Sequence, residues 1–102
     1  MRKVILDGRD GPQTDHKLRD KLTGHLHARL SEYEEEGIRA TLDGAGVIRA
    51  RLPGMDGAQT ACRLAEQGVF AVAEEADVRF LIGPKVSFED LDYVQGVAAK
   101  LL

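Results

Sequence analysis

The last third of the sequence narrows the possible folds most, because helix and strand signals follow one another closely there. Glycine commonly ends helices, so Gly68 can end one here. The runs 70–73 and 78–82 after it are mainly apolar and short enough to be strands. Ser87 can cap a further helix, with Asp90 three residues later as the acid of a capping box. The segment therefore predicts two strands followed by an amphipathic helix.

The first third predicts a strand, a loop and a long helix. The short apolar run 4–6 is followed by residues typical of turns, and Thr14 or Asp15 can cap the helix that comes next. We expect this helix over about residues 15–36. Its apolar residues recur at steps of three and four and end before Gly37: Leu18, Leu22, Leu26, Leu30 and Tyr33.

The middle of the chain predicts a β-hairpin and a short helix. Residues 38–42 and 47–52 alternate apolar and polar side chains around the turn 43–46, which is a hairpin pattern. A helix with small apolar residues on one face follows over about residues 58–65. The expected order is β-α-β-β-α-β-β-α. It favours an α+β fold, a two-layer sandwich with an antiparallel or mixed sheet of about three to five strands and about three helices mainly on one face.

Composition limits the class of protein. The chain has 102 residues, which suits one domain over residues 1–102, and 30% of them are charged, which is ordinary for a globular protein. The net charge of −3 provides no basic field for nucleic acid or an anionic membrane. A single cysteine, Cys62, falls on the apolar face of the short helix and is expected to be a small core residue. With no apolar run long enough to span a bilayer or act as a signal peptide, we expect a cytoplasmic protein.

Arg79 is the first candidate for a binding residue. In the strand 78–82 the apolar residues at 78, 80 and 82 share one face, and Arg79 projects from the other. A guanidinium on a rigid strand can hold a carboxylate by two parallel hydrogen bonds. The alternative is that Arg79 covers an open sheet face or pairs with a nearby acid: Glu74, Glu75 or Asp77.

Three more arginines, Arg39, Arg49 and Arg51, are expected on the same side of the hairpin. Together with Arg79 they form a possible anion patch on an otherwise acidic chain. The alternative is that they keep an open sheet face hydrated and discourage pairing between sheet edges.

The remaining motifs give no metal or nucleophile site. His16, His25 and His27 lack the spacing of three or four residues that places two metal ligands on one helix face. The opening loop, residues 8–14, resembles the phosphate-binding start of flavodoxin-like flavin reductases. Three aspartates in or beside this loop, Asp7, Asp10 and Asp15, oppose a phosphate.

Residues 36–102 resemble the C-terminal small domain of fold-type-I pyridoxal-phosphate enzymes, the aminotransferase-like superfamily. The similarity lies in the hairpin and the helix after it, in a leucine…glycine-valine step from Leu64 to Val69, in the arginine-bearing strand and in a Ser-x-Glu-Asp-hydrophobic-Asp helix start at Ser87 to Asp92. By this resemblance, Arg79 occupies the position whose arginine binds the substrate carboxylate in many members.

The resemblance also implies what the chain lacks. The Schiff-base lysine, the acid that pairs with the pyridine nitrogen and the phosphate cup belong to the family's large domain, which has no counterpart here. We therefore expect a stand-alone small domain without catalytic residues. It would bind no cofactor alone, and pyridoxal phosphate only if a large domain is supplied.

Three functions remain open on the sequence. The chain can act through protein–protein association, as a homodimer or as the complement or remnant of a pyridoxal-phosphate enzyme whose large domain is encoded separately. It can be a small regulatory module that binds an anionic metabolite at the strand arginines. It can also be a small flavin- or nucleotide-binding protein built on the opening loop.

Overall fold

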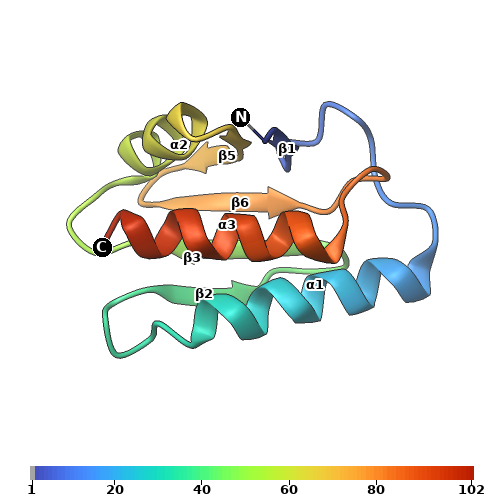
Figure 1. Cartoon of the computed structure of the whole chain (residues 1–102), viewed down its shortest axis with the longest axis horizontal. Helices are drawn as coiled ribbons and strands as arrows, with labels where there is room; N and C mark the ends of the chain where they lie inside the picture. Colours follow the sequence, from blue (N-terminus) through green and yellow to red (C-terminus); the bar gives the residue numbers. More distant parts are fainter. Residues whose placement is uncertain (1) are drawn as a thin grey trace.

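The computed structural model describes residues 2–102, and this part of the chain forms two layers (Figure 1). In chain order the elements are β1 (Val4–Ile5), α1 (His16–Ser31), β2 (Arg39–Leu42), β3 (Val47–Arg51), α2 (Gly57–Glu66), β4 (Val69–Phe70), β5 (Val72–Glu74), β6 (Asp77–Leu81) and α3 (Phe88–Lys100). The α+β class and the layered arrangement predicted from the sequence are confirmed.

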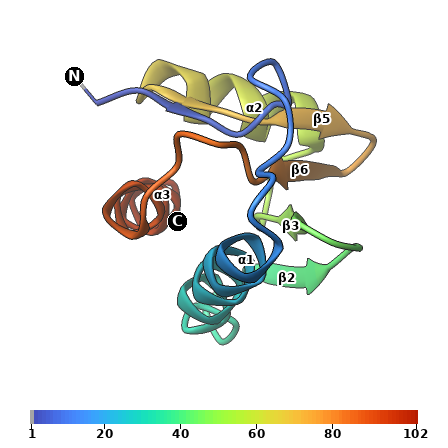
Figure 2. The ribbon, with the colours of Figure 1, turned by 90° about the vertical axis from the view of Figure 1, so that its right-hand side faces the viewer.

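The main sheet has four antiparallel strands in the order β2-β3-β6-β5, and β1 and β4 form a separate parallel pair. A hydrogen bond from the Leu81 amide to the Leu6 carbonyl joins the end of β6 to the segment after β1. Figure 2 shows α1 and α3 beside each other in the helical layer, with the main sheet along one side of it. Helix α2 packs at the other end of the sheet, against β4, β5 and β6.

The hydrophobic core lies between the helices and one face of the main sheet. The strands contribute the inward-pointing residues of β3 and β6, and the helices contribute the apolar stripes that the sequence predicted. Among the fully buried side chains are Leu22, Leu26, Leu30, Ile48, Val78, Phe80, Leu91 and Val94. Because side chains alternate along a strand, burial of these positions leaves the residues between them on the opposite face of the sheet.

Helix α1 begins as predicted but ends earlier. The Asp15 side chain accepts a hydrogen bond from the Leu18 amide and caps the helix. The α-helix ends at Ser31, whereas the sequence analysis expected residue 36, and residues 32–37 form turns. Four glutamates lie in this stretch, and carboxylates are unfavourable at a helix C-terminus because the helix dipole is negative there. Gly37, with φ +108°, then turns the chain into β2.

The predicted strand at residues 70–73 is divided in two. Val69 and Phe70 pair with β1 in parallel, whereas Val72 to Glu74 pair with β6 in an antiparallel ladder. The change of partner occurs at Ala71. It depends on strands far away in the sequence, so the local apolar run does not reveal it.

Helices α2 and α3 both begin with a capping box. The predicted one at Ser87 and Asp90 is confirmed, because each side chain accepts a hydrogen bond from the other residue's amide. Asp56 and Gln59 form the equivalent box on α2. The interpretation of Cys62 as a core residue is wrong, because Cys62 is exposed. Helix α2 instead buries Thr60 and Leu64, one turn apart, since these positions face the strands.

No helix within residues 2–102 combines the length and the apolar character needed to cross a membrane.

Candidate functional site: the arginine face of the sheet

The four arginines predicted for the strands lie on the side of the main sheet opposite the core. Across the ladders, Arg39 is directly opposite Arg51, and Arg49 is directly opposite Arg79. Partners in an antiparallel register point to the same side of the sheet, so all four side chains share one surface. We call this surface, with the acids that contact it, the arginine face.

Arg79 is held by two carboxylates on the arginine face. Its Nε atom lies 3.3 Å from Oε2 of Glu74 and 3.8 Å from Oδ2 of Asp43. The Nε atom is itself buried, and within residues 2–102 it has no partner at hydrogen-bonding geometry. About two thirds of the Arg79 side chain is covered, since its exposed fraction is 32%. Arg79 is therefore largely covered and lies between two carboxylates, with its Nε donor left unsatisfied.

Arg49 lies at the centre of the ion pairs. Its Nη2 atom donates to Oδ2 of Asp43 at 2.9 Å and lies 3.5 Å from Oε1 of Glu74, while Nη1 is 3.5 Å from Oδ2 of Asp77. The hydrogen bond to Asp43 is the main reason that the pKa of Arg49 is raised. Asp43 and Glu74 each contact both Arg49 and Arg79. Two carboxylates thereby bridge two arginines that would otherwise repel across the ladder.

Arg51 pairs with one acid. Its Nε atom donates to Oδ1 of Asp77 at 2.7 Å. The hydrogen bond from Arg51 is the main cause of a lowered pKa for the Asp77 carboxyl, and Arg49 acts in the same direction. Arg39, at the edge strand β2, makes no ion pair with any residue in the range 2–102.

The four arginines, and Glu74 and Asp77 as possible partners of Arg79, are predicted from the sequence. Asp43 is not predicted; it lies just after β2 in the hairpin turn and contacts both Arg49 and Arg79. Only the hairpin register could have indicated this contact. Glu75, the third acid considered, has φ +55° and stays outside the network of ion pairs.

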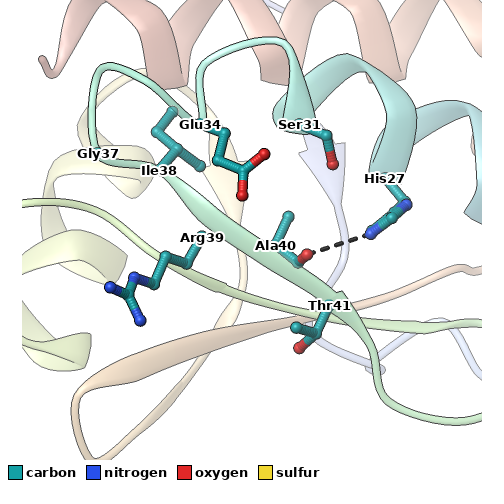
Figure 3. Close-up of a pocket in the computed structure, with 8 residues that line it drawn as sticks. All are labelled: His27, Ser31, Glu34, Gly37, Ile38, Arg39, Ala40 and Thr41. Carbon is teal, nitrogen blue, oxygen red and sulfur yellow. Dashed lines mark hydrogen bonds between the residues drawn. The ribbon is translucent and has the colours of Figure 1, made fainter.

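A large hollow lies beside β2 and not over Arg79. It has a volume of about 670 Å³ and borders the free edge of the sheet, between β2 and the end of α1. Figure 3 shows Nε2 of His27 at the Ala40 carbonyl, a hydrogen bond of 3.1 Å that occupies part of this edge. In the same view, Arg39 and Thr41 leave β2 on one side, and Arg39 points away from Glu34.

Acidic side chains of the opening region already take up donors that a phosphate could use. The Asp15 side chain already occupies the N-terminus of α1 by accepting from the Leu18 amide. Asp7 pairs with Arg9 at 2.7 Å, and this hydrogen bond lowers the pKa of the Asp7 carboxyl. A small hollow of about 230 Å³ beside Gly8 and Gly11 is lined mainly by apolar and glycine residues.

Two of the three histidines, His25 and His27, make contacts between elements. His25 lies 2.8 Å from Asp92, which connects α1 to α3, and His27 contacts the edge of β2. Residues 2–102 contain no cluster of His, Cys, Asp or Glu that could hold a metal ion.

All five lysines of the chain are exposed: Lys3, Lys17, Lys21, Lys85 and Lys100. A lysine that carries pyridoxal phosphate as a Schiff base is normally activated by burial or by a neighbouring cation. None of these amines lies in a buried pocket, so the residues of this chain do not fit the covalent attachment of that cofactor.

Comparisons with known proteins give matches to solved structures only. No protein-family model matches the chain, and no curated protein matches it by sequence. A decarboxylase from Sulfurospirillum multivorans matches with a TM-score of 0.66 and 16% identity, over 84% of this chain and 25% of that one. A NifS-like protein matches with a TM-score of 0.65 and 11% identity, over 81% of this chain and 27% of that one.

A third match is 8-amino-7-oxononanoate synthase from Francisella tularensis, with a TM-score of 0.56 and 13% identity, over 86% of this chain and 28% of the enzyme. The chain thus spans about a quarter of the length of each structure it matches. At these identities the likeness concerns the fold alone, and it confirms the resemblance inferred from the sequence. The chain has the fold of the small domain of fold-type-I pyridoxal-phosphate enzymes.

Proposed function

We propose that this chain acts as an aminotransferase-like small domain, non-catalytic by itself, that works in association with a large cofactor-binding domain. The observation that carries the proposal is the asymmetry of the structural matches. They cover more than four fifths of this chain but only about a quarter of each matched enzyme. The exposure of all five lysines supports the non-catalytic part of the proposal.

In this proposal Arg79 binds the carboxylate of the substrate in the assembled protein. It projects from the inner strand β6, and its buried Nε atom lacks a well-oriented acceptor within residues 2–102. An incoming carboxylate would take over the contacts that Glu74 and Asp43 now make, at 3.3 and 3.8 Å. Arg79 is a suitable residue because a guanidinium binds a carboxylate through two parallel hydrogen bonds.

The first experiment tests the non-catalytic part. The purified chain is incubated with pyridoxal phosphate, reduced with borohydride and analysed by peptide mass spectrometry. We expect low, distributed modification of the exposed lysines, as for any surface amine. Stoichiometric reduction at a single lysine would contradict the proposal, because it would show that this chain holds the cofactor by itself.

The second experiment tests the association. The immobilised chain is used to capture partners from its source lysate, and retained polypeptides are identified by mass spectrometry and assayed for bound pyridoxal phosphate. We expect a polypeptide that contains a fold-type-I large domain. In the complex, Arg79→Gln should raise KM for a carboxylate substrate at least about tenfold, whereas Arg63→Gln, a charge-matched change on α2, should leave it unchanged.

Self-association is the other mode of association that the proposal allows. Strand β2 is an edge of the main sheet, and only part of its free side is occupied, by His27. Sedimentation equilibrium of the purified chain would distinguish a homodimer from a monomer that associates only with a large domain.

A further inference from the structure

A second region of the arginine face has the features of an anion site, separate from the contacts of Arg79 with Glu74 and Asp43. It is a hollow of about 200 Å³ over β2 and β3, lined by Arg39, Thr41, Arg49, Ala50, Arg51 and Asp77. Three guanidinium groups and one hydroxyl therefore surround it, together with a single carboxylate.

The strand register concentrates positive charge at this hollow. Arg39 and Arg51 are directly opposite each other in the β2–β3 ladder, where like charges are unfavourable. On the neighbouring row, Arg49 and Arg79 are also directly opposite, but Asp43 and Glu74 bridge them. The Arg39–Arg51 pair has no such bridge within residues 2–102.

The carboxylates of the arginine face are distributed unevenly. Asp77 contacts Arg51 at 2.7 Å through one nitrogen and Arg49 at 3.5 Å, so its oxygens are already used. Arg39 has no ion pair in the described chain, and Arg51 keeps nitrogens that no carboxylate contacts. Half of the Arg51 side chain is exposed, at 52%, so these donors are accessible from solvent.

We propose that the hollow between Arg39, Thr41 and Arg51 binds an oxyanion group, a phosphate or a carboxylate, which bridges the two opposed arginines. The bound group accepts hydrogen bonds from both guanidinium groups and from the Thr41 hydroxyl. It bridges Arg39 and Arg51 as Asp43 and Glu74 bridge Arg49 and Arg79. The site is formed by this chain alone, so its test is independent of the test of the proposed function.

Titration of the intact, isotope-labelled chain followed by ¹H–¹⁵N NMR tests this inference. Inorganic phosphate and succinate are added in separate experiments at constant ionic strength, maintained with chloride. We expect saturable shifts of the amides in β2 and β3 and of an arginine side chain for at least one of the two. The anion that saturates at the lower concentration identifies the ligand as a phosphate or a carboxylate.

Three variants identify the residues. Arg39→Gln should weaken binding about tenfold, because it removes a charge-assisted contact from an exposed side chain without touching the core. Arg39→Lys should weaken binding less than Arg39→Gln, because lysine retains the positive charge. Some affinity should still be lost, because lysine lacks the planar fork of the guanidinium group. Arg63→Gln on α2 removes the same charge at a distant position and should leave the dissociation constant within about twofold.

Two results would overturn the inference. One is the absence of saturable shifts with both anions. The other is an equal loss of affinity in Arg39→Gln and Arg63→Gln, which would indicate general charge screening and not a site. Far-UV circular dichroism of each variant shows that the comparison is made between folded proteins.

Discussion

At the scale of single residues, two glycines differ in the space around them. Gly57, the first residue of α2, donates its amide to the Glu75 carbonyl at 2.9 Å. A Cβ atom there would overlap the Asp77 carbonyl oxygen and lie 2.6 Å from that of Glu75. Gly24, inside α1, has no atom within 4 Å of an added Cβ. Of the two, only Gly57 allows a close approach between elements, here between α2 and the turn that joins β5 to β6.

Gly57→Ala should therefore destabilise the protein by about 2 kcal/mol, because the backbone of the β5–β6 turn must move. Gly24→Ala should instead stabilise it by about 0.5–1 kcal/mol, since alanine has the higher helix propensity and meets no obstacle. Urea denaturation monitored by circular dichroism measures both. A neutral Gly57→Ala would show that α2 does not approach the turn this closely.

Asp77 makes the stability contributed by the arginine face depend on pH. The folded protein lowers the pKa of this carboxyl below its ordinary value of 3.8, chiefly through the hydrogen bond from Arg51. A lowered pKa in the folded state contributes stability above the unfolded value, and this stability is lost as the pH falls through the folded value. The contribution should therefore be complete at neutral pH and be lost as the pH falls from 3.8 through the lower folded value.

Asp77→Asn tests this dependence. At pH 7 the variant should be less stable than the wild type by about 1 kcal/mol, and the difference should shrink as the pH falls below 3.8. Glu35→Gln, a change in the exposed turn after α1, is the control and should have little effect at any pH. A difference for Asp77→Asn that is the same at pH 7 and pH 3 would exclude an ionic contribution. Thermal melts over this pH range provide the measurement.

At the scale of elements, helix α3 depends on its N-terminal cap. The Ser87 hydroxyl accepts from the Asp90 amide at 3.1 Å, and the Asp90 carboxylate accepts from the Ser87 amide at 3.0 Å. This box satisfies amides that have no partner within the helix. Since Leu91 and Val94 of α3 are fully buried, the start of the helix also sets the position of core residues.

Ser87→Ala should reduce the free energy of unfolding by about 1 kcal/mol. The control is Ser31→Ala at the last residue of α1, where the same substitution affects no N-cap and should change stability by less than about 0.5 kcal/mol. Equal effects of the two substitutions in chemical denaturation would mean that the cap does not stabilise α3.

At the scale of the whole molecule, a single core connects the helical layer to the sheet. Leu26 of α1, Phe80 of β6 and Leu91 of α3 are all fully buried and belong to one hydrophobic cluster. A partly buried hydrogen bond also links α3 to the turn after α1, because Nε2 of Gln95 donates to the Tyr33 hydroxyl at 2.6 Å. This continuity predicts that the chain unfolds as one cooperative unit.

Circular dichroism, which follows the helices, and tyrosine fluorescence, which follows Tyr33 and Tyr93, should give coincident thermal transitions. Leu26→Ala should lower both midpoints together, with a loss of about 2–5 kcal/mol, because it opens a cavity in the shared core. Transitions that separate in the variant or the wild type would show that the helical layer and the sheet are independently stable.

Most of the elements could be predicted because their signals are local. The stripe from Leu22 to Leu30 and the capping residues Asp15 and Ser87 depend on neighbours within a few residues, and the structure agrees with each. The end of α1 was misplaced because the apolar period continues to Tyr33, whereas the glutamates after Ser31 oppose the helix dipole. Cys62 was misplaced because the small residues of α2 do not reveal which side of the helix faces the strands.

The sequence by itself determined the class of the fold and the outward direction of Arg79, because a strand has a period of two and the residues on either side of Arg79 are apolar. Only the tertiary structure decided which charges meet on that surface. Asp43 comes from the hairpin turn, Glu74 from the edge strand β5 and Asp77 from the start of β6, and they reach the arginines through the register of three ladders. The bridged pair of Arg49 and Arg79 and the open pair of Arg39 and Arg51 are thus consequences of long-range strand pairing.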